Sequence, residues 1–212
     1  MRTSEAYGDL VKMGRKVLTT REITARWQTA PAVATQRLRR LEADNLVRRL
    51  RRGLWAIDLQ IEPITLAPYL TAPFPAYVSL FSALYEHGVI EQIPRSVAVI
   101  SLDRRRDVET AIARFSIHHI APELFGGFEG DEERGYVAGV EKAIFDLVYI
   151  RVAAGSRAFF PELHLPPNLR RAELRRWTQR IESRRLRTLV SRNLRSALKA
   201  AIEGADYRMD RL

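Results

Sequence analysis

The sequence predicts an α+β protein in two parts, and two patterns carry this prediction. Within residues 35–57, TQRLRRLEADNLVRRLRRGLWAI, apolar residues at helical spacing give way to two short strand-like runs on either side of a glycine. Further along, the β-rich runs 96–102 and 113–120 precede helical patterns that continue to residue 203. At 212 residues, the chain has room for one large domain or two small ones.

Two successive helices are expected before the hairpin. LTTREITARW (18–27) predicts a short helix that Thr19 or Thr20 can cap at its N-terminus. A turn at 28–30 leads to a longer helix. Pro31 suits its first turn, because proline lacks an N–H that would be unsatisfied there. The residues expected to point into the core are Ile23, Trp27, Ala34, Leu38 and Leu41.

A basic hairpin is expected to follow the second helix. Asp44 and Asn45 form a stop signal, and residues 46–58 then predict two strands joined at Arg51, Arg52 and Gly53. Gly53 can supply the positive φ that a tight turn requires. Helix, short turn, helix and basic hairpin together are the layout of a winged helix-turn-helix, which is predicted over residues 1–60.

The seven arginines within residues 35–57 predict DNA as a partner. The second helix would lie in a major groove, and the hairpin would lie along the phosphates or in the neighbouring minor groove. Expected base-edge or phosphate contacts are Thr35, Gln36, Arg39 and Arg40; expected phosphate contacts are Arg48, Arg49, Arg51 and Arg52; Arg37 can belong to either class. Two other interpretations remain: a structural unit with solvated arginines, and a winged helix that binds another protein.

Composition limits where the protein acts and what it binds. The chain has no cysteine, no apolar run long enough to cross a bilayer and no signal-peptide region, so a cytoplasmic protein that binds no membrane is expected. Lys and Arg number 13 against 6 Asp and Glu in residues 1–60, 9 against 13 in 61–160, and 13 against 6 in 161–212. Both ends are therefore candidates for a polyanionic partner.

A second domain is predicted over residues 77–212, mixed α/β with a small sheet and a helical end. Pro63, Pro68, Pro73 and Pro75 predict an extended linker over residues 61–76. VSLFSALYEHGVIEQ (78–92) predicts an amphipathic helix that ends near Gly88. Its inward-facing residues are expected to be Leu80, Leu84 and Tyr85.

The rest of the second domain is expected to alternate sheet and helix. The runs 96–102 and 113–120 are expected to pair as neighbours in one sheet, and residues 125–135 to form an exposed acidic loop. Helices are predicted at 140–154, 170–182 and 185–203. The last two present a possible second basic surface, for DNA or a partner protein: Arg170, Arg171, Arg175, Arg176, Arg184, Arg185, Arg192 and Arg195.

No catalytic or metal site is predicted, and neither is a cofactor. His118 and His119 are adjacent, so on a strand they point to opposite faces and cannot hold one metal ion together. Glu141, Lys142 and Asp146 lack the spacing of a magnesium-dependent nuclease, the enzyme alternative. Glu141 and Lys142 are expected to cap or flank their helix, with Asp146 exposed or paired with an arginine.

A ligand-sensing regulator is a further alternative. Seven aromatic residues in the second domain can either line an effector pocket or fill a core, and core packing is the favoured interpretation. They are Tyr77, Phe81, Tyr85, Phe115, Phe125, Phe128 and Phe145.

Four blocks of sequence resemble one protein family in order along the chain. They are the segment from LTTREITARW to GLWAI, YVSLFSALYEHGVIEQIP (77–94), FSIHHIAPELFGGFE (115–129) and GVEKAIFDLVYIR (139–151). In these blocks the chain resembles the AbiEi-type antitoxins, transcriptional regulators of type IV toxin–antitoxin and phage-defence loci. The resemblance implies a repressor of its own operon whose C-terminal domain neutralises a nucleotidyltransferase-like toxin, with or without direct contact.

Overall fold

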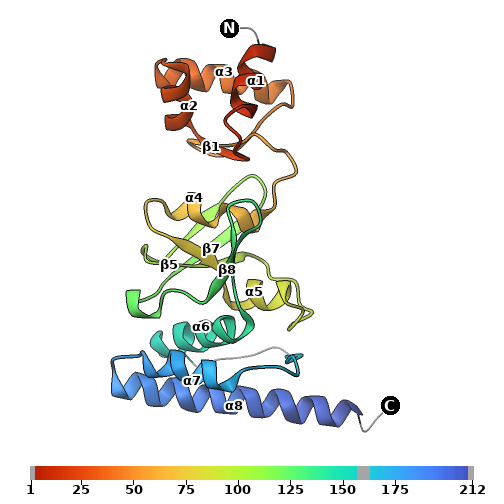
Figure 1. Cartoon of the computed structure of the whole chain (residues 1–212), viewed down its shortest axis with the longest axis vertical. Helices are drawn as coiled ribbons and strands as arrows, with labels where there is room; N and C mark the ends of the chain where they lie inside the picture. The colour runs from red at the N-terminus through yellow and green to blue at the C-terminus, as the bar shows by residue number, and fades with distance from the viewer. Residues whose placement is uncertain (1–2, 157–162, 210–212) are drawn as a thin grey trace. The chain divides into compact units, whose positions relative to one another are not determined.

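The computed structural model describes residues 3–156 and 163–209, which form an α+β protein with eight α-helices and two β-sheets (Figure 1). The chain divides into two compact units. The N-terminal unit comprises Met1–Pro63 with Glu109–Ala113, and the C-terminal unit comprises Ile64–Val108 and Arg114–Leu212. Each unit has its own hydrophobic core.

The N-terminal unit contains three helices and a three-stranded antiparallel sheet. In chain order these are α1 (Thr3–Val11), β1 (Val17–Thr19), α2 (Thr20–Trp27), α3 (Pro31–Ala43), β2 (Arg48–Arg51) and β3 (Leu54–Ala56). The strand order is β1-β3-β2. The predicted α2, α3 and hairpin strands are therefore present. The structure adds α1 and β1, which the sequence analysis did not anticipate.

Local signals fix the ends of α2 and α3. Thr19 caps α2: its Oγ1 accepts a hydrogen bond from the Glu22 N–H at 3.2 Å, and Glu22 Oε2 accepts one from the Thr19 N–H at 2.7 Å. Gln28 ends α2 in the left-handed conformation, and Pro31 occupies the first turn of α3 as predicted. Gly53, at φ +81°, turns the hairpin as predicted.

The core of this unit contains most of the apolar residues expected there. Ile23, Leu38 and Leu41 are fully buried, and Trp55 of β3 is 1 % exposed. Trp27 points inward as expected but is only partly buried, and its indole Nε1 donates to Asp9 Oδ2 at 3.1 Å. The partly buried ring is held by this hydrogen bond at the edge of the core.

The C-terminal unit is built on a six-stranded mixed sheet. Its strands are β4 (Ala76–Val78), β5 (Val97–Ser101), β6 (Arg106–Glu109), β7 (Arg114–His119), β8 (Phe128–Asp131) and β9 (Gly135–Ala138), in the order β6-β7-β5-β4-β9-β8. The predicted pairing of 96–102 with 113–120 is confirmed as β5 beside β7, with Val99 opposite Ile117. The two strands run parallel, because the chain between them forms the edge strand β6.

The expected extended linker is wrong. Pro63–Leu66 forms a 3₁₀ helix and Ala67–Thr71 forms α4, whose first turn contains Pro68. The prolines prevent one long helix, yet two of them occupy first turns, where a missing N–H costs nothing. Leu66 is fully buried and Leu70 is 4 % exposed, so this segment contributes to a packed unit.

Two smaller expectations also differ from the structure. Residues 125–135 contain strand β8 and the first residue of its hairpin partner β9 rather than a plain loop, although Glu129–Arg134 are exposed as expected. Tyr85 is 37 % exposed rather than inward, because α5 (Leu80–Glu86) buries Leu80, Ala83 and Leu84 instead. Gly88 follows the end of α5 at φ +66°, as predicted.

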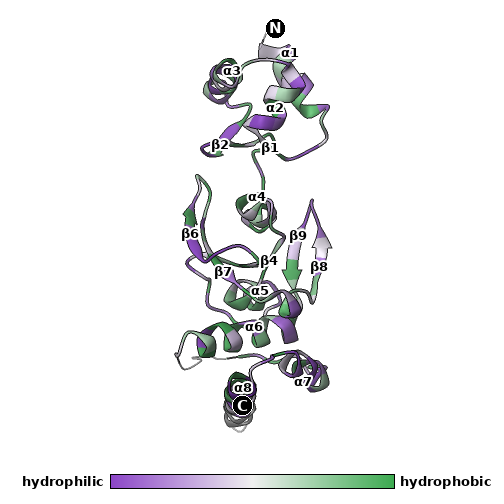
Figure 2. Cartoon of the chain, turned by 90° about the vertical axis from the view of Figure 1, so that its left-hand side faces the viewer, coloured by the Kyte–Doolittle hydropathy of each residue, from purple (hydrophilic) through white to green (hydrophobic). Residues whose placement is uncertain are grey.

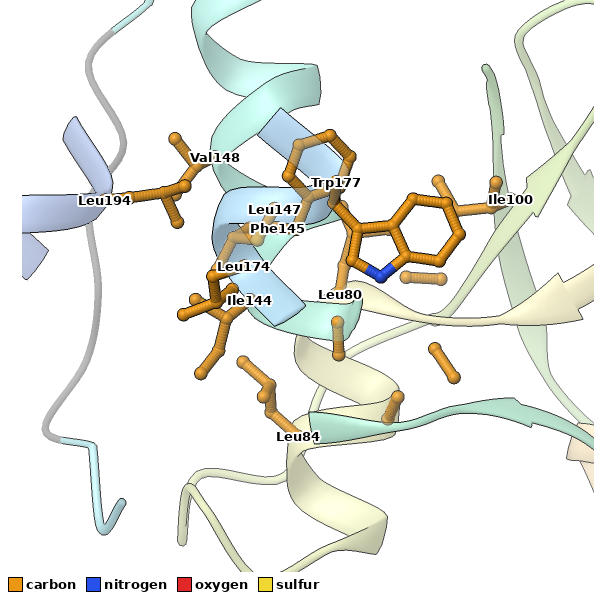
Figure 3. Packing of buried hydrophobic residues seen from close by; sticks show 14 of the residues in the cluster. Leu80, Leu84, Ile100, Ile144, Phe145, Leu147, Val148, Leu174, Trp177 and Leu194 are labelled. Atoms are coloured by element: carbon orange, nitrogen blue, oxygen red, sulfur yellow. The ribbon is translucent and has the colours of Figure 1, made fainter. Parts of the chain in front are cut away.

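The helix α6 (Val140–Ala153) forms the centre of the C-terminal unit. It packs against α5, α7 (Arg171–Gln179) and α8 (Arg184–Met209), and both views place it between the sheet and the α7–α8 layer (Figures 1 and 2). Figure 3 shows Trp177 of α7 beside Phe145, and Leu194 of α8 facing Val148. Residues 141–148 are all buried, so α6 has no solvent face along that stretch.

A buried ion pair lies within α6, contrary to the expectation that Lys142 flanks the helix and Asp146 is exposed or bound to an arginine. Lys142 is 1 % exposed and Asp146 is fully buried, and the two side chains pair one helical turn apart. Lys142 Nζ also donates to the carbonyl of Leu124 at 2.8 Å. Asp146 Oδ2 accepts hydrogen bonds from Ser79 Oγ at 2.8 Å and from the Tyr77 hydroxyl at 3.1 Å.

Removing one member of this pair is expected to destabilise the C-terminal unit severely. Lys142→Met leaves the Asp146 carboxylate buried without its cation, which costs about 3–5 kcal/mol of unfolding free energy. The double variant Lys142→Met with Asp146→Asn should lose less than Lys142→Met alone. The asparagine amide is uncharged, and its oxygen still accepts from Ser79 and Tyr77. Urea unfolding of the full chain measures both.

The exposed Lys12, changed to Met, is the matched control and should shift the unfolding free energy by less than about 0.5 kcal/mol. Equal losses for Lys142→Met and Lys12→Met would show that the buried pair does not stabilise the unit.

Candidate nucleic-acid interface

The outer face of α3 carries part of the predicted DNA-contact set. Ala34, Leu38 and Leu41 are buried on the inner face, while Gln36, Arg39 and Arg40 are exposed. Thr35 is only partly exposed, and its Oγ1 donates to the carbonyl of Pro31 at 2.8 Å. The helix therefore presents one amide and two guanidinium groups outward.

One exposed residue on the same face was missed by the sequence analysis. Val33, in the first turn of α3, is 38 % exposed. An apolar residue outside the helix's buried stripe was the signal that could have indicated it. A methyl-bearing side chain at this place can contact the methyl group of thymine in a major groove.

Two arginines from the predicted set have structural contacts within the unit. The Arg37 guanidinium carbon lies 5.9 Å from the centre of the Trp27 ring, and that of Arg49 lies 5.9 Å from the centre of the Trp55 ring. The Arg49 N–H also donates to Glu42 Oε1 at 2.8 Å, which ties the hairpin to the end of α3. Both side chains are half-buried.

The hairpin presents its other arginines outward. Arg48, Arg51 and Arg52 are exposed, whereas Leu50 is 2 % exposed. The pairing of β2 with β3 is irregular between Arg49 and Arg51, and a bulge of this kind re-aims side chains along a strand. Figure 2 shows β2 as a largely hydrophilic strand.

Ion pairing distinguishes these exposed arginines from Arg15 and Arg26 of the same unit. Arg15 pairs with Glu22, and Arg26 Nε donates to Asp9 Oδ1 at 3.1 Å. The hydrogen bond from Arg26 holds the pKa of the Asp9 carboxyl below its usual value. On α3 and the hairpin, five exposed arginines have no acidic partner among the residues that the structure describes: Arg39, Arg40, Arg48, Arg51 and Arg52. Arg21, in the first turn of α2, is also exposed and has no acidic partner among these residues. Their charge is available to a polyanion.

The arginines of the predicted second basic surface differ in their surroundings. Arg170 pairs with Glu141 and Glu173. Arg171, Arg175 and Arg195 line a groove of about 810 Å³ between α7 and α8, together with Leu174, Leu194 and Leu198. Arg176, Arg184, Arg185 and Arg192 are exposed but do not line this groove. The sequence analysis missed Arg187 and Lys199, which also line it.

Two histidines lie next to each other on one strand. On β7, His118 is half-buried and His119 is exposed. Within residues 3–156 and 163–209, no group of three His, Asp or Glu side chains is arranged to hold a metal ion. None of the described helices combines the length and the apolar character that crossing a membrane requires.

Comparison of the chain with protein-family models and with curated proteins found no match.

The two half-buried arginines are expected to contribute to stability. Replacing Arg37 or Arg49 with Ala removes a cation from an aromatic ring, which should lower the unfolding free energy by about 0.5–1 kcal/mol for each. Arg40→Ala and Arg48→Ala, which remove exposed arginines from the same two elements, should change it by less than about 0.5 kcal/mol. Urea unfolding measures all four, and equal effects across the set would contradict the assignment.

Proposed function

We propose that the N-terminal unit is a winged helix-turn-helix that binds duplex DNA, with α3 in the major groove and the β2–β3 hairpin on the phosphate backbone. The observation that carries the proposal is the group of five exposed arginines on α3 and β2–β3 that have no acidic partner in the described part of the chain. The order α2, short turn, α3 and hairpin supports it, because that is the layout of this DNA-binding fold.

The outward side chains divide into two roles by their chemistry. The Gln36 amide can pair with adenine and the Arg39 guanidinium with guanine, since both pairings are bidentate in the major groove. Val33 can add an apolar contact to thymine. The remaining exposed arginines suit phosphates, which position a protein without reading sequence. They are Arg40, Arg48, Arg51 and Arg52.

The salt dependence of DNA affinity is expected to distinguish the role of the hairpin arginines from that of the α3 side chains. Arg51→Ala with Arg52→Ala should weaken binding to all duplexes. It should also reduce the slope of log K against log salt by about 0.9 for each lost phosphate contact. Gln36→Ala or Arg39→Ala should cost about 1–3 kcal/mol on the cognate site and little on unrelated DNA. Fluorescence anisotropy with the region upstream of the gene, titrated over salt, measures both effects.

Lys12→Ala is the charge-matched control, because it removes an exposed cation of the same unit from the end of α1. Its affinity and salt slope should stay close to those of the parent protein. If the parent protein binds the upstream region no more tightly than random DNA at moderate salt, the proposal that it is a repressor is wrong.

For the whole chain, the proposed function is repression of its own operon combined with neutralisation of a nucleotidyltransferase-like toxin, as the resemblance to AbiEi-type antitoxins implies. The three later sequence blocks that resemble this family fall on β4 and α5, on β7 to β8, and on α6. These segments supply much of the core of the C-terminal unit, which supports a shared fold. The arginines of α7 and α8 lie outside those blocks.

Charge reversal in the α7–α8 groove is expected to distinguish a toxin-facing surface from a second DNA contact. Arg171→Glu, Arg175→Glu and Arg195→Glu together place three acids in the groove. If the groove meets the toxin, the triple variant should lose rescue of toxin-producing cells and keep operator binding. The opposite result assigns the groove to DNA. A growth assay and a gel shift on the same variant give the two readouts.

The control is Arg176→Glu, Arg184→Glu and Arg192→Glu, which reverses the same charge on these helices at positions outside the groove. It should leave both readouts unchanged. Failure of the parent protein to rescue cells from a toxin encoded beside it would end the antitoxin proposal, leaving a winged-helix regulator.

A further inference from the structure

A second cavity, of about 600 Å³, lies within the C-terminal unit between the sheet and the α5–α6 layer. Its apolar wall comes from Leu80 and Phe81 of α5 and from Leu147 and Ile150 of α6. Phe81 is the one of the seven aromatic residues considered earlier that lines this cavity, whereas Tyr77, Phe115 and Phe145 are buried core residues, as packing predicts. The volume falls in the range of small-molecule pockets.

Three arginines reach this cavity from three separate segments. Arg95 precedes β5, Arg105 lies between β5 and β6, and Arg151 is in the last turn of α6. None has an acidic partner in residues 3–156 or 163–209. The neighbouring Arg106 differs, because it pairs with Asp103 and donates to the carbonyl of Leu70 at 2.7 Å. The cavity thus gathers three cations that the described protein does not neutralise.

On the side of the cavity formed by the sheet, the lining includes neutral polar groups. His118 of β7 is half-buried, and its burial together with Arg105 and Arg151 lowers the pKa of the imidazole, against the opposing effect of Asp107. The imidazole is therefore neutral at pH 7 and offers one donor and one acceptor. Ser96 Oγ and Ser116 Oγ, 3.1 Å apart, add hydroxyl groups beside it.

We propose that this cavity binds an organic phosphate whose phosphate groups contact Arg95, Arg105 and Arg151 and whose flat apolar part packs on Phe81, Leu147 and Ile150. Guanidinium groups match phosphate oxygens in bidentate geometry. A phosphate group carries about −1.5 to −2 charges, so one or two groups balance three arginines. Nucleotides combine both chemical features. This site stands independently of DNA binding by the N-terminal unit.

Isothermal titration calorimetry of the full chain tests the site with three probes: ADP, adenosine and inorganic pyrophosphate. ADP should bind saturably. Adenosine lacks the phosphates and so loses the charged contacts, and it should bind at least about tenfold more weakly. Pyrophosphate lacks the apolar part and so loses the packing on Phe81, Leu147 and Ile150, and it should also bind at least about tenfold more weakly. Pyrophosphate binding as tightly as ADP would overturn the apolar half of the proposal, and no saturable ADP binding would overturn all of it.

Substitutions locate the binding. Arg105→Gln and Arg151→Gln should each weaken ADP by about tenfold. Arg104→Gln is the matched control, because Arg104 is the exposed neighbour of Arg105 and does not line the cavity. Phe81→Ser should weaken ADP and leave pyrophosphate unchanged, with folding checked by circular dichroism. Equal weakening by Arg104→Gln and Arg105→Gln would contradict the assignment.

A competition experiment separates this ligand class from nucleic acid. A short single-stranded oligonucleotide should fail to displace a fluorescent ADP analogue from the full chain. If it displaces the analogue at lower concentration than ADP does, the cavity belongs to a nucleic-acid surface and the organic phosphate proposal falls.

Discussion

The C-terminal unit depends on a pair of charges that water does not reach. Lys142 and Asp146 lie on α6, which packs against α5, α7 and α8. Removing two charges from water costs several kcal/mol per ion, so such a pair persists only when every polar atom has a partner. Here Ser79, Tyr77 and the carbonyl of Leu124 provide those partners, which fixes β4 and the 122–124 turn against α6.

Arginine has three different physical roles in this chain, and sequence alone does not separate them. Some arginines are neutralised, as Arg26 is by Asp9, and some lie over aromatic rings, as Arg49 does over Trp55. Others, such as Arg51 and Arg151, are exposed or line a cavity without an acidic partner among the described residues. Only the third group has positive charge that is available to a ligand. The candidate sites are therefore the places where arginines without an acidic partner among the described residues come together.

Sequence patterns predicted α2, α3 and the hairpin well, because Thr19, Pro31 and Gly53 mark ends and turns through local chemistry. The patterns were less informative where strand direction or side-chain burial depends on residues far away in the sequence. The residues of 96–120 do not indicate that β5 and β7 run parallel, because this direction depends on β6 taking the edge position next to β7. The burial of Lys142 and Asp146 was missed because both types are normally exposed. Their i, i+4 spacing was the available clue. In the candidate site, the sequence could not show that Arg37 and Arg49 pack on tryptophan rings rather than face solvent.

The position of Trp177 has an optical consequence. Its ring centre lies 4.4 Å from Lys142 Nζ and 4.3 Å from the Arg180 guanidinium carbon, so the indole sits in a strong local field from two cations. Indole emission responds to such fields. The other two tryptophans, Trp27 and Trp55, belong to the N-terminal unit and have no lysine beside them among the described contacts. Separation of α7 from α6 would thus change the emission of one tryptophan in the molecule, giving the C-terminal unit an intrinsic spectroscopic reporter.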